Sequence, residues 1–127
     1  MKVLVIAPLE EPVLREIDGS LAAMQRIVGG HIQAVYPFEE PVALVCHDEG
    51  KLLGLPLNRA LYHPETGELC DVIAGTFFLC GAPPGSGDFT SLTGEQIRLF
   101  SRRFARPEVI VSLGGRLTAV PAEEACP

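Results

Sequence analysis

The alternation of apolar and polar residues divides the start of the chain into two strands and a helix. The run KVLVIAP is rich in β-branched residues and predicts a first strand. VLREID follows the turn residues EEP, alternates apolar with polar residues, and predicts a second, shorter strand. Ser20 is a suitable helix N-cap, and apolar residues recur at helical spacing from there to the pair Gly29 and Gly30. We therefore expect a helix that begins after Ser20 and ends at this glycine pair.

The middle of the chain has the patterns of further strands. HIQAVYPF and PVALVCHDEGK are two apolar runs joined by another EEP turn, and they predict an antiparallel hairpin. DVIAGTFFLCG is the most strand-like segment of the chain and predicts a central strand of the sheet. LYHPETGELC is polar and rich in turn residues, so we expect an excursion from the sheet there.

The segment KLLGLPLNRAL, residues 51–61, is apolar but broken. Gly54 and Pro56 prevent a continuous helix, although a short third helix over residues 55–62 stays open. We expect an irregular connector that packs on the core and holds its polar side chains in fixed positions. Five leucines provide the residues for burial: Leu52, Leu53, Leu55, Leu57 and Leu61.

The segment SLTGEQIRLFSRRF predicts a second helix. Thr93 and Gln96 have the spacing of a capping box, and an apolar stripe follows at Ile97, Phe100 and Phe104. After this helix, residues 109–113 could form one more strand before the chain becomes irregular.

Strands and helices do not alternate strictly, which makes a doubly wound parallel sheet a poor fit. We predict an α+β fold with a mostly antiparallel sheet of about five or six strands and two helices packed on it. Residues 1–104 should form a single domain, and residues 105–127 a C-terminal extension.

The composition is that of a globular chain with an acidic balance. Of the 127 residues, 47% are hydrophobic and 20% are charged. The net charge of -6 argues against a protein that binds nucleic acid directly through its phosphates. No run reaches the roughly 18 apolar residues that cross a membrane. We therefore expect a protein of the cytoplasm of whatever cell makes it, with no membrane partner.

The cysteines and histidines show no ligand spacing. The four cysteines lie far apart and contain no C-x-x-C pair, so we expect free and mostly buried thiols, with Cys126 exposed near the terminus. Cys70 and Cys80 should be hard for a substrate to reach. The histidines should be solvated turn residues, and we expect no metal site: they are His31, His47 and His63.

No motif indicates catalysis or a cofactor. The glycine-rich stretch GAPPGSG lacks the lysine of a phosphate-binding P-loop and is followed by an aspartate, so we interpret it as a surface loop. The short SLGGR segment is interpreted in the same way. No set of nucleophile, acid and base can be named, so we expect no catalytic residues, no cofactor, and a binding protein more readily than an enzyme.

The candidate ligand-binding residues are Lys51, Asn58, Arg59 and Arg102. The first three lie on the broken connector, where Asn58 and Arg59 could instead satisfy hydrogen bonds of irregular backbone. Arg102 belongs to a cluster of four of the ten basic residues. These arginines could balance the helix dipole, contact an anionic ligand, or form a self-association surface.

Several segments together resemble a known family. They are MKVLVIAP, REIDGSLAAMQRIVGGHIQAV, VALVCHDEGKLLGLPLNRAL, DVIAGTFFLCG and DFTSLTGEQI. In this order they are similar to small domains of unknown function that occur in phages, plasmids and conjugative elements, chiefly of Gram-positive bacteria. The resemblance covers Met1 to about Phe104 and implies a mobile-element setting, but no reaction.

Two functional hypotheses follow. The first is a non-enzymatic protein that sequesters a small anionic or nucleotide-like signal to counter host defence, with a site that forms most easily in a homo-oligomer. The alternative is an acidic protein that binds and inhibits a host nucleic-acid-binding protein, which the negative net charge suggests.

Overall fold

The structure is a computed structural model, and it describes residues 1–125. The strands are β1 (Lys2–Ile6), β2 (Val13–Glu16), β3 (Ile32–Val35), β4 (Val42–His47), β5 (Leu57–Tyr62), β6 (Leu69–Ala74), β7 (Phe77–Gly81), β8 (Glu108–Leu113) and β9 (Arg116–Pro121). The helices are α1 (Leu21–Val28), α2 (Gly94–Arg103) and the short α3 (Ala122–Ala125). The predicted α+β class is confirmed. None of the helices within the described residues is long and apolar enough to cross a membrane.

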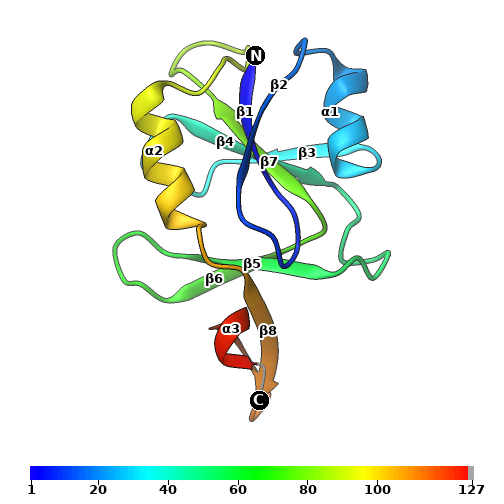
Figure 1. The fold of residues 1–127 in the computed structure, drawn as a ribbon, viewed down its shortest axis with the longest axis vertical. Coiled ribbons are helices and arrows are strands. Elements are labelled where there is room, and N and C mark those ends of the chain that lie inside the picture. The colour runs from blue at the N-terminus through cyan, green and yellow to red at the C-terminus, as the bar shows by residue number, and fades with distance from the viewer. Residues whose placement is uncertain (126–127) are drawn as a thin grey trace.

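A five-stranded sheet with the order β2-β1-β7-β4-β3 forms the centre of the molecule (Figure 1). Neighbouring strands within this sheet are antiparallel, and so are the strands of the two-stranded sheets β5–β6 and β8–β9. The predicted antiparallel sheet and the hairpin of β3 with β4 are therefore confirmed. In Figure 1 the β5–β6 pair crosses below the main sheet, and β8 extends away from β5.

Both faces of the central sheet are buried. Successive side chains of a strand point to opposite faces, so β1 contributes Leu4 and Ile6 to one core and Val3 and Val5 to the other. Phe100 of α2 packs in the first core, together with residues of β5 and β6. Residues of α1 pack in the second core, so the two helices cover opposite faces of the sheet.

The two helices begin at the residues that the sequence predicts. The hydroxyl of Ser20 accepts a hydrogen bond from the N–H of Ala23 at 3.1 Å, and Gly29 ends α1 with a φ of 82°. At α2, Thr93 and Gln96 form the reciprocal capping box, with hydrogen bonds of 3.1 and 2.9 Å.

The sequence predicts one strand over DVIAGTFFLCG, but this segment forms two strands, β6 and β7. Gly75 separates β6 from β7 and has a φ of 81°, a backbone conformation that residues other than glycine rarely adopt. Its N–H donates to the carbonyl of Pro56 at 2.7 Å, and a Cβ atom here would lie 2.9 Å from Leu55. Only β7, the second half of the segment, is the central strand of the main sheet.

The connector also differs from the prediction. Residues 57–62 form the strand β5 and not a helix, and the preceding residues form turns. Leu52 and Leu53 are 87% and 58% exposed, so the expected packing of these leucines on the core is wrong. Leu57 is 39% exposed and Leu61 only 4%, which leaves Leu61 as the leucine of this segment that enters the core.

The C-terminal extension is more regular than expected. The strand that we predicted over residues 109–113 is present as β8. The residues after it are not irregular, because β9 pairs with β8 along its length and α3 follows. Gly114 and Gly115 have φ angles of 59° and 81°, which is the combination that a tight type I′ hairpin turn requires. Cys126 lies outside the described residues.

The three cysteines of the described region are free, and two of them match the predicted burial. Cys46 and Cys80 are buried, whereas Cys70 on β6 is exposed, contrary to our expectation. Burial raises the pKa of the Cys80 thiol to about 12, and burial likewise raises the pKa of the Cys46 thiol. Because the thiolate is the reactive form, the two buried thiols should be inert.

Alkylation of the native protein is therefore expected to modify Cys70 and to spare Cys46 and Cys80. Peptide mapping by mass spectrometry after a short iodoacetamide treatment measures each site separately. In denaturant all three should react. Comparable native labelling of Cys70 and Cys80 would contradict the observed packing of β7.

Candidate functional site

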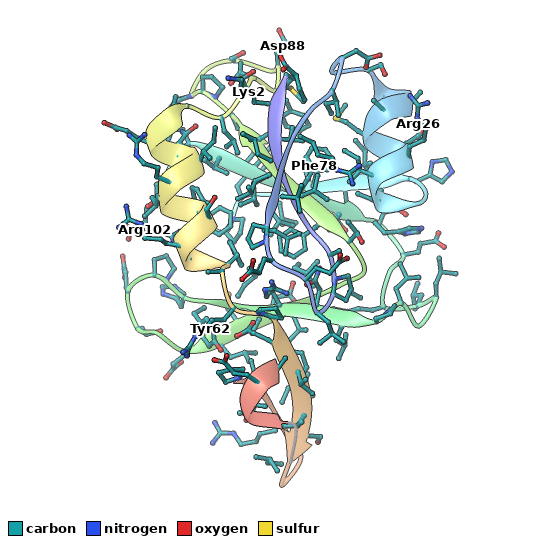
Figure 2. The ribbon with its side chains drawn as sticks, in the orientation of Figure 1. Lys2, Arg26, Tyr62, Phe78, Asp88 and Arg102 are labelled. Carbon is teal, nitrogen blue, oxygen red and sulfur yellow. The ribbon has the colours of Figure 1, made fainter. Side chains whose placement is uncertain are left out.

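A cavity of about 580 Å³, which we call the α2–β5 cavity, lies between the end of α2, the strand β5 and the loop before β4. Residues 102–104, 59–62 and 37–40 supply these three walls. The C-terminal extension adds Glu108 at the start of β8. Figure 2 shows Arg102 and Tyr62 on the same side of the molecule, one beside α2 and the other near β5.

Arg59 is the buried cation of this cavity. Its side chain is 1% exposed, although the residue forms part of the cavity wall. Nη1 donates to Oδ1 of Asn58 at 2.9 Å, and Nη2 donates to the carbonyls of Glu10 and Phe104 at 2.6 and 3.2 Å. Nε is buried and has no hydrogen-bond partner among the described residues. Arg59 thus ties the β1–β2 turn and the end of α2 to β5.

The side chain of Asn58 donates hydrogen bonds to backbone carbonyls and does not line the cavity. It is fully buried, and its Nδ2 donates to the carbonyls of Ile6 and Gly75, each at 2.9 Å. Both carbonyls belong to segments that are far from Asn58 in the sequence. For this residue the geometry therefore matches the alternative in which the side chain satisfies the backbone.

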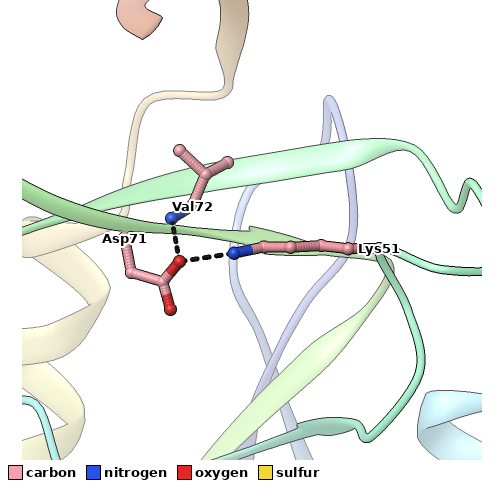
Figure 3. Close-up of polar contacts among 3 residues, drawn as sticks. All are labelled: Lys51, Asp71 and Val72. Atoms are coloured by element: carbon pink, nitrogen blue, oxygen red, sulfur yellow. Dashed lines mark hydrogen bonds and ion pairs between the residues drawn. The ribbon is translucent and has the colours of Figure 1, made fainter.

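Lys51 lies apart from the other candidate residues. Its Nζ is 2.6 Å from Oδ1 of Asp71, which also accepts a hydrogen bond from the N–H of Val72 (Figure 3). Lys51 lines a smaller cavity of about 160 Å³, beside Cys46 and His47. The structure thus brings Arg59 and Arg102 to one cavity and places Lys51 at another.

The arginines at the end of α2 have different surroundings. Arg103 pairs with both carboxylate oxygens of Glu40, at 3.1 and 3.3 Å, and its guanidinium lies 4.6 Å from the ring centre of Phe100. Arg106 lies 3.3 Å from Glu123, with both side chains exposed. Arg102 makes no ion pair with any side chain that the structure describes, and it is exposed at the cavity wall.

The charge on Arg59 is only partly balanced within the protein. Burial lowers the pKa of the Arg59 guanidinium, and the carboxylate of Glu108 acts in the opposite direction. An arginine stays protonated in a folded protein, so burial leaves a positive charge with little water around it. No described carboxylate lies within ion-pair distance of Arg59. An anion in the cavity would therefore be attracted to this side chain.

The Glu40–Arg103 pair predicts a pH dependence of stability. The hydrogen bonds from Arg103 hold the pKa of Glu40 below its ordinary value of 4.5. Because the pKa is lower in the folded chain, the pair stabilises the protein fully above about pH 4.5 and loses this effect as the pH falls through the folded pKa.

Between about pH 5 and about pH 3, the urea midpoint of the wild type should therefore fall more steeply than that of Arg103→Gln. The measurement is urea unfolding at a series of pH values for the two proteins. Parallel profiles over this range would show that the pair contributes nothing.

Sequence reasoning did not identify Phe38, Tyr62 and Glu108 as residues of the site. Phe38 and Tyr62 belong to segments interpreted as strand end and excursion, and Glu108 follows the second helix as an ordinary acidic residue. No local pattern joins these three residues, because β5, the loop before β4 and β8 meet only in the folded chain.

The described residues include no group of three or more histidine, cysteine, aspartate or glutamate side chains arranged to hold a metal ion. No curated protein and no solved structure matches the chain. A family model described as a domain of unknown function, DUF3846, matches residues 1–105. This range holds β1 to β7 and α2 and stops before β8. The chain therefore belongs to the DUF3846 family of domains of unknown function.

Proposed function

We propose that the protein is a non-enzymatic binder of small anionic, nucleotide-like molecules, which it holds in the α2–β5 cavity. The observation that carries this proposal is the state of Arg59. It is a buried cation at the cavity wall, its Nε has no partner among the described residues, and no described carboxylate pairs with it. Filling the cavity with an anion would stabilise this charge.

The remaining walls of the cavity suit a ligand that is partly aromatic and partly anionic. A volume of about 580 Å³ lies in the range that small-molecule sites have. Phe38, Tyr62 and Phe104 offer aromatic surface, and Arg102 and Arg106 offer guanidinium groups that can pair with phosphate. A nucleotide combines a flat ring with phosphate and so matches both kinds of wall.

The lining residues favour binding over catalysis. The described residues that line the cavity include no serine, threonine or cysteine that could act as a nucleophile. Arg103 and Glu40 are engaged with each other, and Asn58 and Lys51 lie outside the cavity. The proposed ligand-binding residues are therefore Arg59 and Arg102, and Arg106 would assist them only on leaving its exposed pair with Glu123.

Isothermal titration calorimetry with mono-, di- and cyclic nucleotides at low salt tests the proposal. The wild type should bind at least one of them, and Arg102→Gln should weaken that binding about tenfold or more, because a hydrogen bond to a charged group is lost. Arg98→Gln is the matched control, since Arg98 is also exposed on α2 but does not line the cavity. Absence of binding to the whole panel, or equal effects of the two substitutions, would overturn the proposal.

We further propose a mobile-element setting, in which a phage or plasmid protein withdraws a nucleotide-like signal of host defence, acting as a homo-oligomer. The support is the resemblance to small domains of such elements. Protein purified from an infected host and then denatured should release a nucleotide that mass spectrometry identifies. If no nucleotide is released by the wild type, or Arg102→Gln releases as much, the sequestration role is wrong.

A further inference from the structure

Glu108 gives the β5 side of the α2–β5 cavity an acidic group. It is the first residue of β8 and lies just beyond the part of the chain that matches the family. Its Oε1 accepts a hydrogen bond from the N–H of Ala60 at 3.0 Å. Because β5 pairs with β6 on its other side, this bond fixes the carboxylate at the free edge of β5.

The carboxylate of Glu108 acts electrostatically on Tyr62 and on the buried guanidinium of Arg59. Burial and then the charge of Glu108 raise the pKa of Tyr62, and the same charge acts on Arg59. Tyr62 is 47% exposed, so part of its ring is available to a ligand. The β5 side of the cavity therefore offers an aromatic surface and a carboxylate, while Arg102 lies on the α2 side.

A carboxylate only accepts hydrogen bonds, so it selects ligand groups that donate. Oε2 of Glu108 makes no hydrogen bond to a residue that the structure describes, and Oε1 keeps a second lone pair. Guanine presents two neighbouring donors on one edge, N1–H and the 2-amino group. Adenine presents a donor beside an acceptor, and uracil presents one donor between two carbonyl oxygens, which a carboxylate would repel.

We infer that the α2–β5 cavity selects guanine nucleotides, with Glu108 accepting from N1–H and the 2-amino group while Arg102 pairs with phosphate. The inference rests on the proposed function and names the ligand class of that site. It assigns a recognition role to the extension beyond the family match, since this extension supplies Glu108. The arginines would hold any nucleotide, and Glu108 would decide which base is accepted.

The test is calorimetry with GMP, AMP, CMP and UMP, which carry the same phosphate. The wild type should bind GMP at least about tenfold more tightly than AMP, as expected for a paired set of charged hydrogen bonds. Glu108→Gln keeps an oxygen acceptor for Ala60 but turns the other oxygen into a donor. An amide of this kind matches the donor and acceptor of adenine, so the variant should lose its preference for GMP and bind AMP better.

Glu95→Gln is the control, because Glu95 is an exposed glutamate that does not line the cavity, and it should leave the preference for GMP unchanged. IMP lacks the 2-amino group and should bind the wild type several-fold more weakly than GMP, a comparison that requires no variant. Equal binding of all four nucleotides, or of IMP and GMP, would overturn the guanine inference and leave the proposed function standing. Absence of binding to every nucleotide would overturn both.

Discussion

Replacing Arg59 with alanine is expected to lower the free energy of unfolding by about 3 to 5 kcal/mol. The substitution removes a side chain that is 1% exposed and leaves three acceptors without their donor. Two of these acceptors, the carbonyls of Glu10 and Phe104, belong to the β1–β2 turn and the end of α2. Urea unfolding followed by circular dichroism measures the change.

Lys51→Ala is the control for this prediction. The Lys51–Asp71 pair is exposed at both side chains, and such pairs contribute about 0 to 1 kcal/mol. A loss for Arg59→Ala that is as small as the loss for Lys51→Ala would show that the buried guanidinium does not hold these segments together.

Replacing Phe100 with alanine is expected to cost about 3 to 5 kcal/mol, because it opens a cavity between α2 and the sheet. Phe100 is fully buried, and its ring lies edge-on to Phe38 with the centroids 4.8 Å apart. The guanidinium of Arg103 lies 4.6 Å from the centre of the same ring. The free energy of unfolding of the variant, measured by urea unfolding at neutral pH, tests the prediction.

Leu99→Ala provides the comparison on the same helix. Leu99 is 39% exposed and adjoins Phe100 in the sequence, so its truncation should cost less than about 1 kcal/mol. Losses of similar size at the two positions would contradict the orientation of α2 on the sheet.

Local signals in the sequence were sufficient for most of the family domain. Ser20 and Thr93 cap their helices through hydrogen bonds to residues three positions away, so both caps can be identified from sequence alone. KVLVIAP is a strand because its β-branched residues fit a strand that is buried on both faces. Each of these features depends on neighbours in the chain.

The strand β5 could not be predicted in this way. Its residues 58–61 are buried without interruption, so the alternation that identifies a half-exposed strand is absent. Gly75 looks like part of a strand in the sequence, but its positive φ separates β6 from β7. For β9 a signal was present, because two glycines between apolar runs favour a type I′ hairpin.

The candidate site was predicted only in part, because its geometry depends on distant contacts. Arg59 was identified as a candidate, but its partners Glu10 and Phe104 lie far away in the sequence on both sides. Arg102 joins it because the end of α2 meets β5. Lys51 does not lie at this cavity, because the residues before β5 turn outward and expose Leu52 to solvent.

The proposed function requires that a nucleotide enters the α2–β5 cavity beside Arg59. Titration of the ¹⁵N-labelled protein with GMP, followed by ¹H–¹⁵N spectra, tests this claim residue by residue. We predict saturable shifts of the Arg59 Nε–H and the Tyr62 amide signals, with the amide signals of Lys51 and Arg26 unchanged. Unchanged Arg59 and Tyr62 signals at millimolar GMP, or shifts confined to Lys51 or α1, would contradict it.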